Sequence, residues 1–285
     1  MNQDPPPPAA PTPTLIPVLA GGGARLPAYI GILAGLDDLG IHYSHIVGVS
    51  GGSIVAALRA SGRSLEEIRQ IALDTNFSDF LGQNLFSLLR SGGLSNGDRF
   101  ERWMDEQMDG CCFEDLDTDL TVIATDVRSG TAEVFSRATT PKERVSLAVR
   151  YSMSVPLLFS FKTHGEKIMT DGSILSEEAL RHDWSGDGTP VVIFKLRGSG
   201  GFASPKGAPL VPLRGYLAML IHTFLTTIAH EFVSDEFWLS TVIIDVGDIS
   251  PVAFALPPQD KERLYAMGLS QTLTHLPRKM RVLAI

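Results

Sequence analysis

Short apolar runs alternate with longer segments of mixed polarity along most of the chain, and this alternation predicts a fold of strands and helices. The run LIPVLA at residues 15–20 stops at three glycines, and HIVGV at residues 45–49 stops at Ser50. Runs of this length bounded by small residues are typical of buried strands. Between the two runs, Pro27 suits the first turn of a helix and Gly40 suits its end.

The same pattern continues to the C-terminus. We expect helices at residues 51–62, from 65 onward behind a capping box, at 142–151, 213–232 and 259–276, and strands at 121–127, 131–136, 157–162, 166–170, 190–196 and 241–245. The pair at 121–136 reads as a hairpin, and the segment 77–97 is expected to be partly helical. Strands that alternate with helices predict an α/β fold with a mainly parallel sheet covered on both faces.

The first fourteen residues carry most of a proline-rich stretch, which predicts a disordered leader at 1–14 before a single domain at 15–285. No cationic start with an apolar run marks a secretory signal, and no 18 apolar residues run together, so neither a cleaved signal peptide nor a membrane span is expected, and export by a route without such a signal stays an alternative. The two cysteines, Cys111 and Cys112, are adjacent, which argues against a structural disulfide. These features favour a cytoplasmic protein, with peripheral membrane attachment left open.

Composition narrows the classes of partner. The chain has 285 residues, of which 44% are hydrophobic and 20% charged, as in an ordinary globular protein. Its formal net charge of −8 offers no basic surface for a phosphate backbone, so nucleic acid is not expected as a partner. No HExxH-like spacing of His, Asp and Glu occurs, so neither a metal nor another cofactor is expected.

The clearest candidate for chemistry is Ser50. It lies in the pentapeptide Gly48-Val49-Ser50-Gly51-Gly52, a GxSxG pattern between an expected strand and an expected helix. A sharp strand-to-helix turn needs small residues at Gly48 and Gly52, and it presents the serine hydroxyl as a nucleophile. The pattern alone is equally consistent with a glycine-rich helix start that has a serine cap.

A second glycine-rich turn, GGGAR at residues 21–25, also lies between an expected strand and an expected helix. Three glycines can expose backbone N–H groups without obstruction, which suits an oxyanion hole. Phosphate binding is the competing use, but Leu26 breaks the GxGxxG pattern and no Lys-Ser/Thr pair follows. A purely structural turn is the third alternative, which the nearby serine motif makes weaker.

A nucleophilic serine needs a base. By chain order an α/β-hydrolase triad would take it from the histidines that follow the serine, namely His182, His222, His230 and His275. Such a triad normally places its serine after several strands, whereas this one follows only the second. Asp171, where the strand KIMT stops at Asp-Gly, is the better candidate, although an ordinary Asp-Gly turn would explain it on this pattern alone.

Four motifs together resemble those of the patatin-like phospholipases. They are GGGAR at 21–25, GVSGGSIVAAL at 48–58, AVRYSMSVPLLF at 148–159 and the DG turn at 171–172, within a resemblance that covers residues 15 to about 276. The resemblance implies a three-layer α/β/α sandwich and a Ser–Asp dyad in place of a triad. It also implies hydrolysis of acyl esters of phospholipids and other lipids.

Carried over by position, the resemblance makes Ser50 the nucleophile and Asp171 the general base. Arg25 would hold the glycine loop or an anionic head group. The implied oxyanion hole comprises Gly21, Gly22, Gly23 and Ala24. Where the family often has glycine, this chain has Leu26 and Ser173, and neither is expected to touch the dyad.

The expected function is therefore a lipid acyl hydrolase whose partner is a lipid, either dispersed or at a membrane surface. Acyl transfer to an alcohol uses the same residues and stays an alternative, as does a non-catalytic lipid-binding protein on this fold. The apolar helix expected at 213–232 carries too broad an apolar stripe for one narrow face. We interpret it as a core helix. The alternative is that this helix and the loop before it form a mobile apolar segment that contacts the lipid surface.

Overall fold

The structure is a computed structural model that describes residues 12–82, 88, 92–174, 183–198, 216, 219–221, 223 and 238–283. Most of the expected leader and most of the apolar helix expected at 213–232 lie outside these residues. Within the leader as predicted, Pro13 accepts a hydrogen bond from the N–H of His42, and Thr14 bridges to His42. The ordered pairing of the chain thus begins slightly before residue 15.

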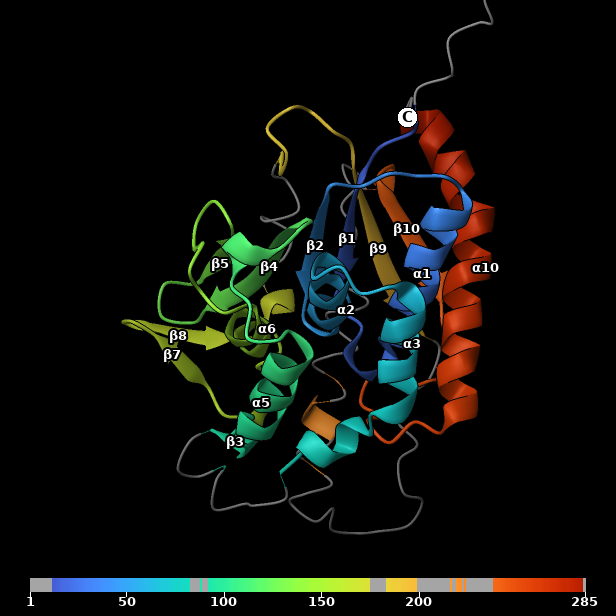
Figure 1. The fold of residues 1–285 in the computed structure, drawn as a ribbon. Helices are drawn as coiled ribbons and strands as arrows, with labels where there is room; N and C mark the ends of the chain where they lie inside the picture. Colours follow the sequence, from blue (N-terminus) through green and yellow to red (C-terminus); the bar gives the residue numbers. More distant parts are fainter. Residues whose placement is uncertain are drawn as a thin grey trace, which may run out of the picture.

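The central element is a mixed, mostly parallel sheet, as the alternation of strands and helices predicted (Figure 1). Five parallel strands lie in the order β10 (Thr241–Asp245), β9 (Val191–Arg197), β1 (Ile16–Ala20), β2 (His45–Val49) and β4 (Asp119–Asp126). Beyond β4, the antiparallel strands are β5 (Thr131–Ser136), β7 (Lys162–His164) and β8 (Lys167–Thr170). The hairpin expected at 121–136 is β4 with β5.

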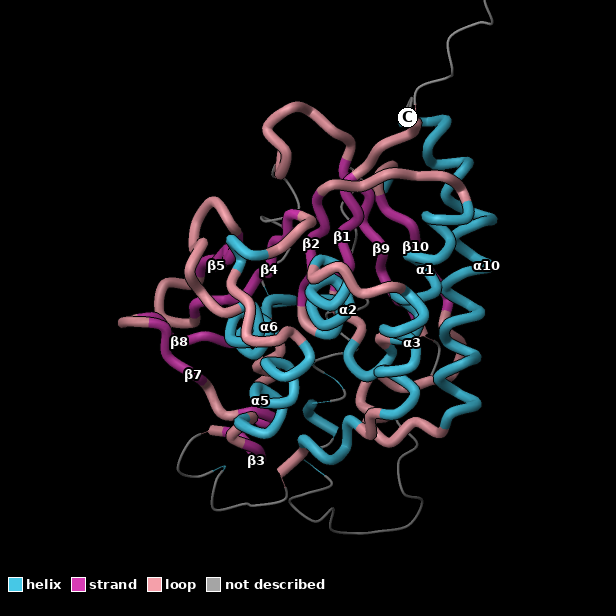
Figure 2. The backbone as a smooth tube through the Cα atoms, viewed as in Figure 1, coloured by secondary structure: helices cyan, strands magenta, loops and turns pink. Residues whose placement is uncertain are grey.

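Within the described residues, five helices form where they were expected: α1 (Pro27–Asp38), α2 (Gly51–Ala60), α3 (Leu65–Asp74), α6 (Val145–Ser152) and α10 (Pro258–Leu283). The helix α5 (Asp98–Gln107) was not predicted. Short 3₁₀ turns are η1 (Gly23–Arg25), η2 (Phe77–Phe80), η3 (Phe113–Asp115) and η4 (Gly172–Ile174). The capping box before α3 forms, with Ser64 and Glu67 bonded reciprocally. Figure 2 shows β2, β1, β9 and β10 next to one another, with α1 and α10 side by side near β10.

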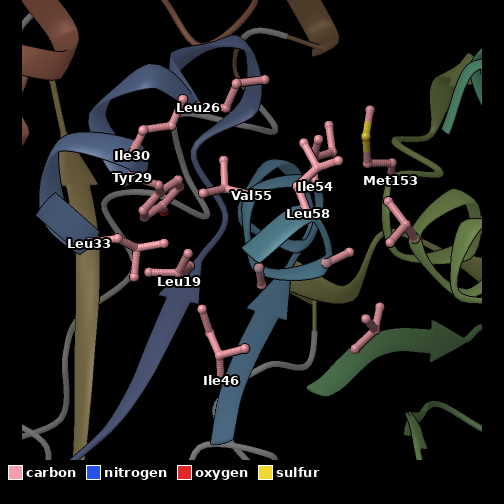
Figure 3. Close-up of a cluster of buried hydrophobic side chains, with 14 of the residues drawn as sticks. Leu19, Leu26, Tyr29, Ile30, Leu33, Ile46, Ile54, Val55, Leu58 and Met153 are labelled. Atoms are coloured by element: carbon pink, nitrogen blue, oxygen red, sulfur yellow. The ribbon is translucent and has the colours of Figure 1, made fainter. Parts of the chain in front are cut away.

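The hydrophobic core is divided between the two faces of the sheet. Neighbouring residues of a strand point to opposite faces, so Leu19 and Ile46 join a large core while Val18 and Val47 join a smaller one. Every described helix contributes its buried apolar residues to the large core. Figure 3 shows part of it, where side chains from β1, β2, α1 and α2 meet. This core fixes the glycine-rich turn and the serine turn relative to each other.

Two other details also differ from the expectation. The strand β6 (Leu157–Phe159) does not join the main sheet but pairs with β3 (Gly93–Ser95) in a separate two-stranded sheet. The last helix does not end at residue 276 and continues through Pro277. A proline removes one helical hydrogen bond, to the carbonyl four residues before it. That residue, Leu273, is exposed, so water can solvate its carbonyl.

Candidate active site

Ser50 forms the sharp turn between β2 and α2. Its φ of 51° and ψ of −128° are rare for a residue with a side chain, and such conformations cluster at functional sites. A Cβ at Gly48 would lie 2.5 Å from the Cα of Ser53, and a Cβ at Gly52 would lie 2.2 Å from the carbonyl oxygen of Leu19. The two glycines of the GxSxG pattern are thus required by close backbone packing in this turn.

The strand β4 brings the second half of the site to this turn. Val49, the last residue of β2, pairs with Ile123, and Thr170, the last residue of β8, pairs with Thr125. Because β5 occupies the whole opposite edge of this part of β4, β2 and β8 must share one edge. They approach each other from opposite directions, so the residue after each strand enters the same gap.

Those two residues are Ser50 and Asp171, and they are hydrogen-bonded. The Ser50 Oγ donates to Asp171 Oδ2 at 2.6 Å, and the two residues are 3% and 0% exposed. A hydroxyl that donates to a buried carboxylate can pass its proton there while the oxygen attacks an electrophile. The geometry therefore suits a nucleophile and its base.

Burial raises the pKa of the Asp171 carboxyl from 3.8 to about 6, and hydrogen bonds from Ser50 and Ser173 lower it only in part. At neutral pH the carboxylate is therefore mostly ionised, but it is a stronger base than a solvated aspartate. A base with a pKa near the operating pH is the effective kind. Of the four candidate histidines, only His275 lies within the described residues, and it is exposed on α10.

The glycine-rich turn lies directly against the serine turn. Gly21, Gly22 and Gly23 all have positive φ, at 77°, 99° and 58°, which three consecutive residues with side chains would not adopt. A Cβ at Gly51 would lie 3.1 Å from the backbone nitrogen of Gly23, so the two turns are in contact.

Two of the four expected oxyanion donors are already occupied. The N–H of Gly21 donates to the carbonyl at the end of β2 at 3.0 Å, and the N–H of Ala24 donates to Pro251 at 2.8 Å. The N–H groups of Gly22 and Gly23 have no partner within the part of the chain that the structure describes. These two groups are the ones that can receive a developing negative charge.

The buried side chain of Arg25 holds the glycine turn in place through hydrogen bonds to backbone carbonyls. It is 2% exposed, and its Nε donates to the carbonyl oxygen of Gly22 at 3.1 Å, while its Nη2 donates to that of Leu196 at 3.4 Å. Burial lowers the pKa of Arg25 to about 10, so it stays protonated at neutral pH. The Gly22 carbonyl and the Gly23 N–H belong to one trans peptide and point in opposite directions. Arg25 therefore fixes the direction of the Gly23 N–H.

The end of α6 supports both halves of the site, which the sequence did not reveal. The Ser152 Oγ accepts the Ser50 N–H at 2.8 Å and donates to the Ile123 carbonyl at 2.6 Å. Two residues later, the Ser154 carbonyl accepts the N–H of Asp171 at 3.1 Å. The only signal in the sequence was two serines within the otherwise mostly apolar motif at 148–159.

The side chain of Arg150 holds the segment that contains Ser152 and Ser154 in place. It is 1% exposed, and its Nη1 donates to the Ser154 Oγ at 2.6 Å, while its Nη2 donates to the carbonyls of Asn96 and Ser160 at 2.8 and 3.0 Å. Burial lowers the pKa of Arg150 to about 10, so it too stays protonated at neutral pH. A charged side chain thus ties the small β3–β6 sheet to the segment that carries both serines.

Residues 18–180 match the sequence model of the family described as "Patatin-like phospholipase". The matched stretch is more than half of the chain and contains the glycine turn, the serine turn and Asp171. The chain belongs to the patatin-like phospholipase family. The resemblance drawn from the four motifs is therefore confirmed.

Several curated relatives in sequence have no characterised function. YqhO of Bacillus subtilis is 30% identical over 282 residues, which span 90% of this chain and 95% of that protein. R571 of Acanthamoeba polyphaga mimivirus is 25% identical over 88% of this chain and 90% of its own length. An NTE family protein of Mycobacterium bovis is 29% identical over 68% of this chain, but that match spans only 32% of the mycobacterial protein.

Solved structures share the fold of this patatin-like phospholipase. VipD from Legionella pneumophila superposes with a TM-score of 0.60 at 16% identity, covering 95% of this chain and 68% of VipD. ExoU from the type III secretion system of Pseudomonas aeruginosa, in complex with SpcU, superposes with a TM-score of 0.54 at 18% identity. The match covers 95% of this chain and 53% of ExoU. Identities this low support the mostly parallel α/β fold and nothing about substrate.

One expectation about family departures was wrong. Ser173 was expected not to touch the dyad, but its N–H donates to Asp171 Oδ1 at 2.9 Å. Leu26, the other departure, is buried in the large core (Figure 3). Within the described residues no cluster of three or more His, Cys, Asp or Glu could hold a metal, and no helix there is long and apolar enough to cross a membrane.

Replacing Ser152 by alanine should destabilise this patatin-like fold more than the matched change Ser53→Ala. Ser152→Ala leaves the buried Ser50 N–H and the buried Ile123 carbonyl without this partner, and each buried unpaired group costs about 1–3 kcal/mol. The Ser53 Oγ also bonds Ser50, but the carbonyl it serves keeps a second donor, the Ser53 N–H. Urea unfolding of both variants measures the difference, and equal losses would argue against the support role of Ser152.

Asp171→Asn should change how stability depends on pH. Because the folded pKa lies above the unfolded value of 3.8, the folded state binds the extra proton between pH 3.8 and about 6. The stabilisation that Asp171 supplies is therefore fully present below pH 3.8 and is lost as pH rises through 6.

The unfolding free energy of the wild type, minus that of Asp171→Asn, should thus fall by up to about 3 kcal/mol across this window. Denaturant unfolding at half-unit pH steps measures it. A difference that rises with pH would mean that hydrogen bonding outweighs burial at this carboxylate.

Proposed function

We propose that this chain is a serine lipid acyl hydrolase that cleaves carboxylic esters of lipids, of the phospholipase, lysophospholipase or esterase type. The observation that carries the proposal is the 2.6 Å hydrogen bond from Ser50 to the buried Asp171. Membership of the patatin-like phospholipase family supports a lipid ester as the substrate. The glycine turn beside Ser50 supports acyl transfer chemistry, because it offers next to the nucleophile two N–H groups that have no partner among the described residues.

The proposed reaction has two halves. The Ser50 Oγ attacks the ester carbonyl carbon, and its proton passes to Asp171 Oδ2. The negative charge on the carbonyl oxygen is held by the N–H groups of Gly22 and Gly23 until the carbon–oxygen bond breaks and the leaving alcohol takes the proton. Water then attacks the acyl-enzyme with Asp171 again accepting the proton, and the fatty acid leaves as Ser50 recovers its hydrogen.

Three features of the surroundings support this chemistry. Arg25 fixes the peptide that carries one donor, Ser152 fixes the strained backbone of Ser50, and Ser154 fixes the backbone of Asp171. Pre-oriented groups need no rearrangement when charge develops, and removing one such donor typically costs about 10²–10³ in kcat.

A fluorophosphonate probe should label Ser50 stoichiometrically, since only an activated serine reacts. Ser50→Ala should abolish labelling and lower hydrolysis by at least about 10³-fold, and Asp171→Asn should lower it on the order of 10⁴-fold. Fatty acids released from a mixture of phospholipids and neutral lipids give the readout. As the matched control, His275→Ala should keep most of its activity, as should alanine at the other three histidines.

Each alternative has its own outcome in the same experiment. A folded wild type that neither reacts with the probe nor releases fatty acid would favour a non-catalytic lipid-binding protein. A histidine variant that folds but is inactive, together with an active Asp171→Asn, would replace the dyad by a triad. Adding glycerol or lysolipid and analysing the products distinguishes acyl transfer from hydrolysis, because transfer yields a new ester in place of free fatty acid.

A further inference from the structure

The position of Asp171 depends on the short strand that precedes it. β8 has four residues, and its pairing with β4 comprises the pairs Thr125–Thr170 and Asp126–Met169. Its other neighbour is β7, a three-residue strand at the edge of the sheet (Figure 1). A slip of one residue along β4 would turn the side chains of β8 to the other face of the sheet. The register of this short pairing therefore decides whether the base faces the nucleophile.

The side chain of Asp126, the last residue of β4, extends this pairing by one residue. In a regular antiparallel ladder, a hydrogen-bonded pair of opposite residues exchanges two backbone hydrogen bonds. Val127 and Ile168 are the next residues opposite each other, and the Val127 N–H donates to the Ile168 carbonyl at 2.9 Å. The Ile168 N–H, however, donates to Asp126 Oδ1 at 3.0 Å, where a regular pair would use the Val127 carbonyl. The carboxylate thus takes the place of a backbone acceptor.

The same carboxylate is held by the turn between β4 and β5. Asp126 is 4% exposed, its Oδ1 also accepts the Arg128 N–H at 3.0 Å, and its Oδ2 accepts the Ser129 hydroxyl at 2.7 Å. A bond from an aspartate to the backbone two residues on is common in turns. The bond to Ile168 is different, because it joins residues 42 positions apart in the chain. The side chain of Asp126 therefore ties the turn to β8.

We propose that Asp126 is a positioning residue, whose carboxylate fixes β8 in register on β4 and thereby holds Asp171 against Ser50. The inference rests on the proposed function. Ile168 lies three residues before Asp171, so Asp126 holds the start of β8. The end of β8 is held separately, because the Asp171 N–H donates to the Ser154 carbonyl at 3.1 Å. With both ends of the strand held, the distance from the base to the nucleophile is fixed.

Four variants separate this role from that of an ordinary turn residue. Asp126→Ala removes the acceptor of the Ile168 N–H. Asp126→Asn keeps Oδ1, and its amide can donate to the Ser129 oxygen, so it is the conservative variant. Asp126→Glu keeps the charge but displaces the carboxylate by one methylene. Ser129→Ala is the matched control, because it removes a bond to the same carboxylate on the turn side and leaves the bond to Ile168.

The readouts are kcat and KM for fatty acid release and the rate at which a fluorophosphonate labels Ser50. In Asp126→Ala and Asp126→Glu, kcat and the labelling rate should fall about 10- to 100-fold with little change in KM, because a base displaced by about 1 Å costs on this scale. Asp126→Asn and Ser129→Ala should stay close to the wild type. Hydrogen exchange at the Ile168 amide, measured by NMR, should speed up at least about tenfold in the first two variants only.

A folded Asp126→Ala protein with the kcat of the wild type would overturn the inference, as would an equal loss of kcat in Ser129→Ala. If Asp126→Ala does not fold, the order of the other two variants decides, and an Asp126→Glu protein as active as Asp126→Asn would overturn it.

If the wild type neither reacts with the probe nor releases fatty acid, the proposed function fails. The exchange experiment still decides whether Asp126 fixes β8, since it needs no catalysis. An Ile168 amide that exchanges as slowly in Asp126→Ala and Asp126→Glu as in the wild type would then overturn the inference.

Discussion

The whole site depends on one constraint of strand pairing: β2 and β8 meet on a single edge of β4 from opposite directions. The parallel strand ends opposite Ile123 and the antiparallel strand ends opposite Thr125. The register therefore delivers Ser50 and Asp171 to each other, although 121 residues separate them in the chain. A slip of one residue in either pairing would turn the side chains that follow to the other face of the sheet. The hydrogen bond between the two residues is thus a consequence of sheet register.

The site formed in this way is costly to keep folded. Ser50 has a backbone conformation of a kind that costs on the order of 1–3 kcal/mol, and the carboxylate of Asp171 is entirely buried. Neutral hydrogen bonds offset part of this cost, with Ser152 holding the backbone of Ser50 and Ser154 holding that of Asp171. The incomplete compensation is useful, because it leaves the carboxylate with a pKa of about 6 and hence a stronger base. Stability and basicity are opposed at this one residue.

The sequence predicted most of the strands and helices, and Ser50 as a candidate nucleophile, because local signals mark them, whereas Asp171 was singled out mainly through the resemblance of four motifs to a family. Apolar runs that stop at small residues located β1 and β2, and close packing at Gly48 and Gly52 imposes the GxSxG pattern. Contacts made across the fold left no such signal. The support from Ser152, and the contact of Ser173 with Asp171, arise where distant segments meet. The continuation of α10 through Pro277 was also missed, because the sequence does not show that the carbonyl left without a helical hydrogen bond belongs to an exposed residue.

The central claim is that the pairing along β4 assembles a nucleophile, a base and an oxyanion site without a histidine. A crystal structure of the protein after reaction with a fluorophosphonate tests this claim most directly, because the phosphorus mimics the tetrahedral carbon. We expect phosphorus on the Ser50 Oγ, its free oxygen about 3 Å from the backbone nitrogens of Gly22 and Gly23, and Asp171 as the only ionisable side chain against the Oγ. Phosphorus on another residue, or a histidine bonded to the Oγ, would contradict the claim.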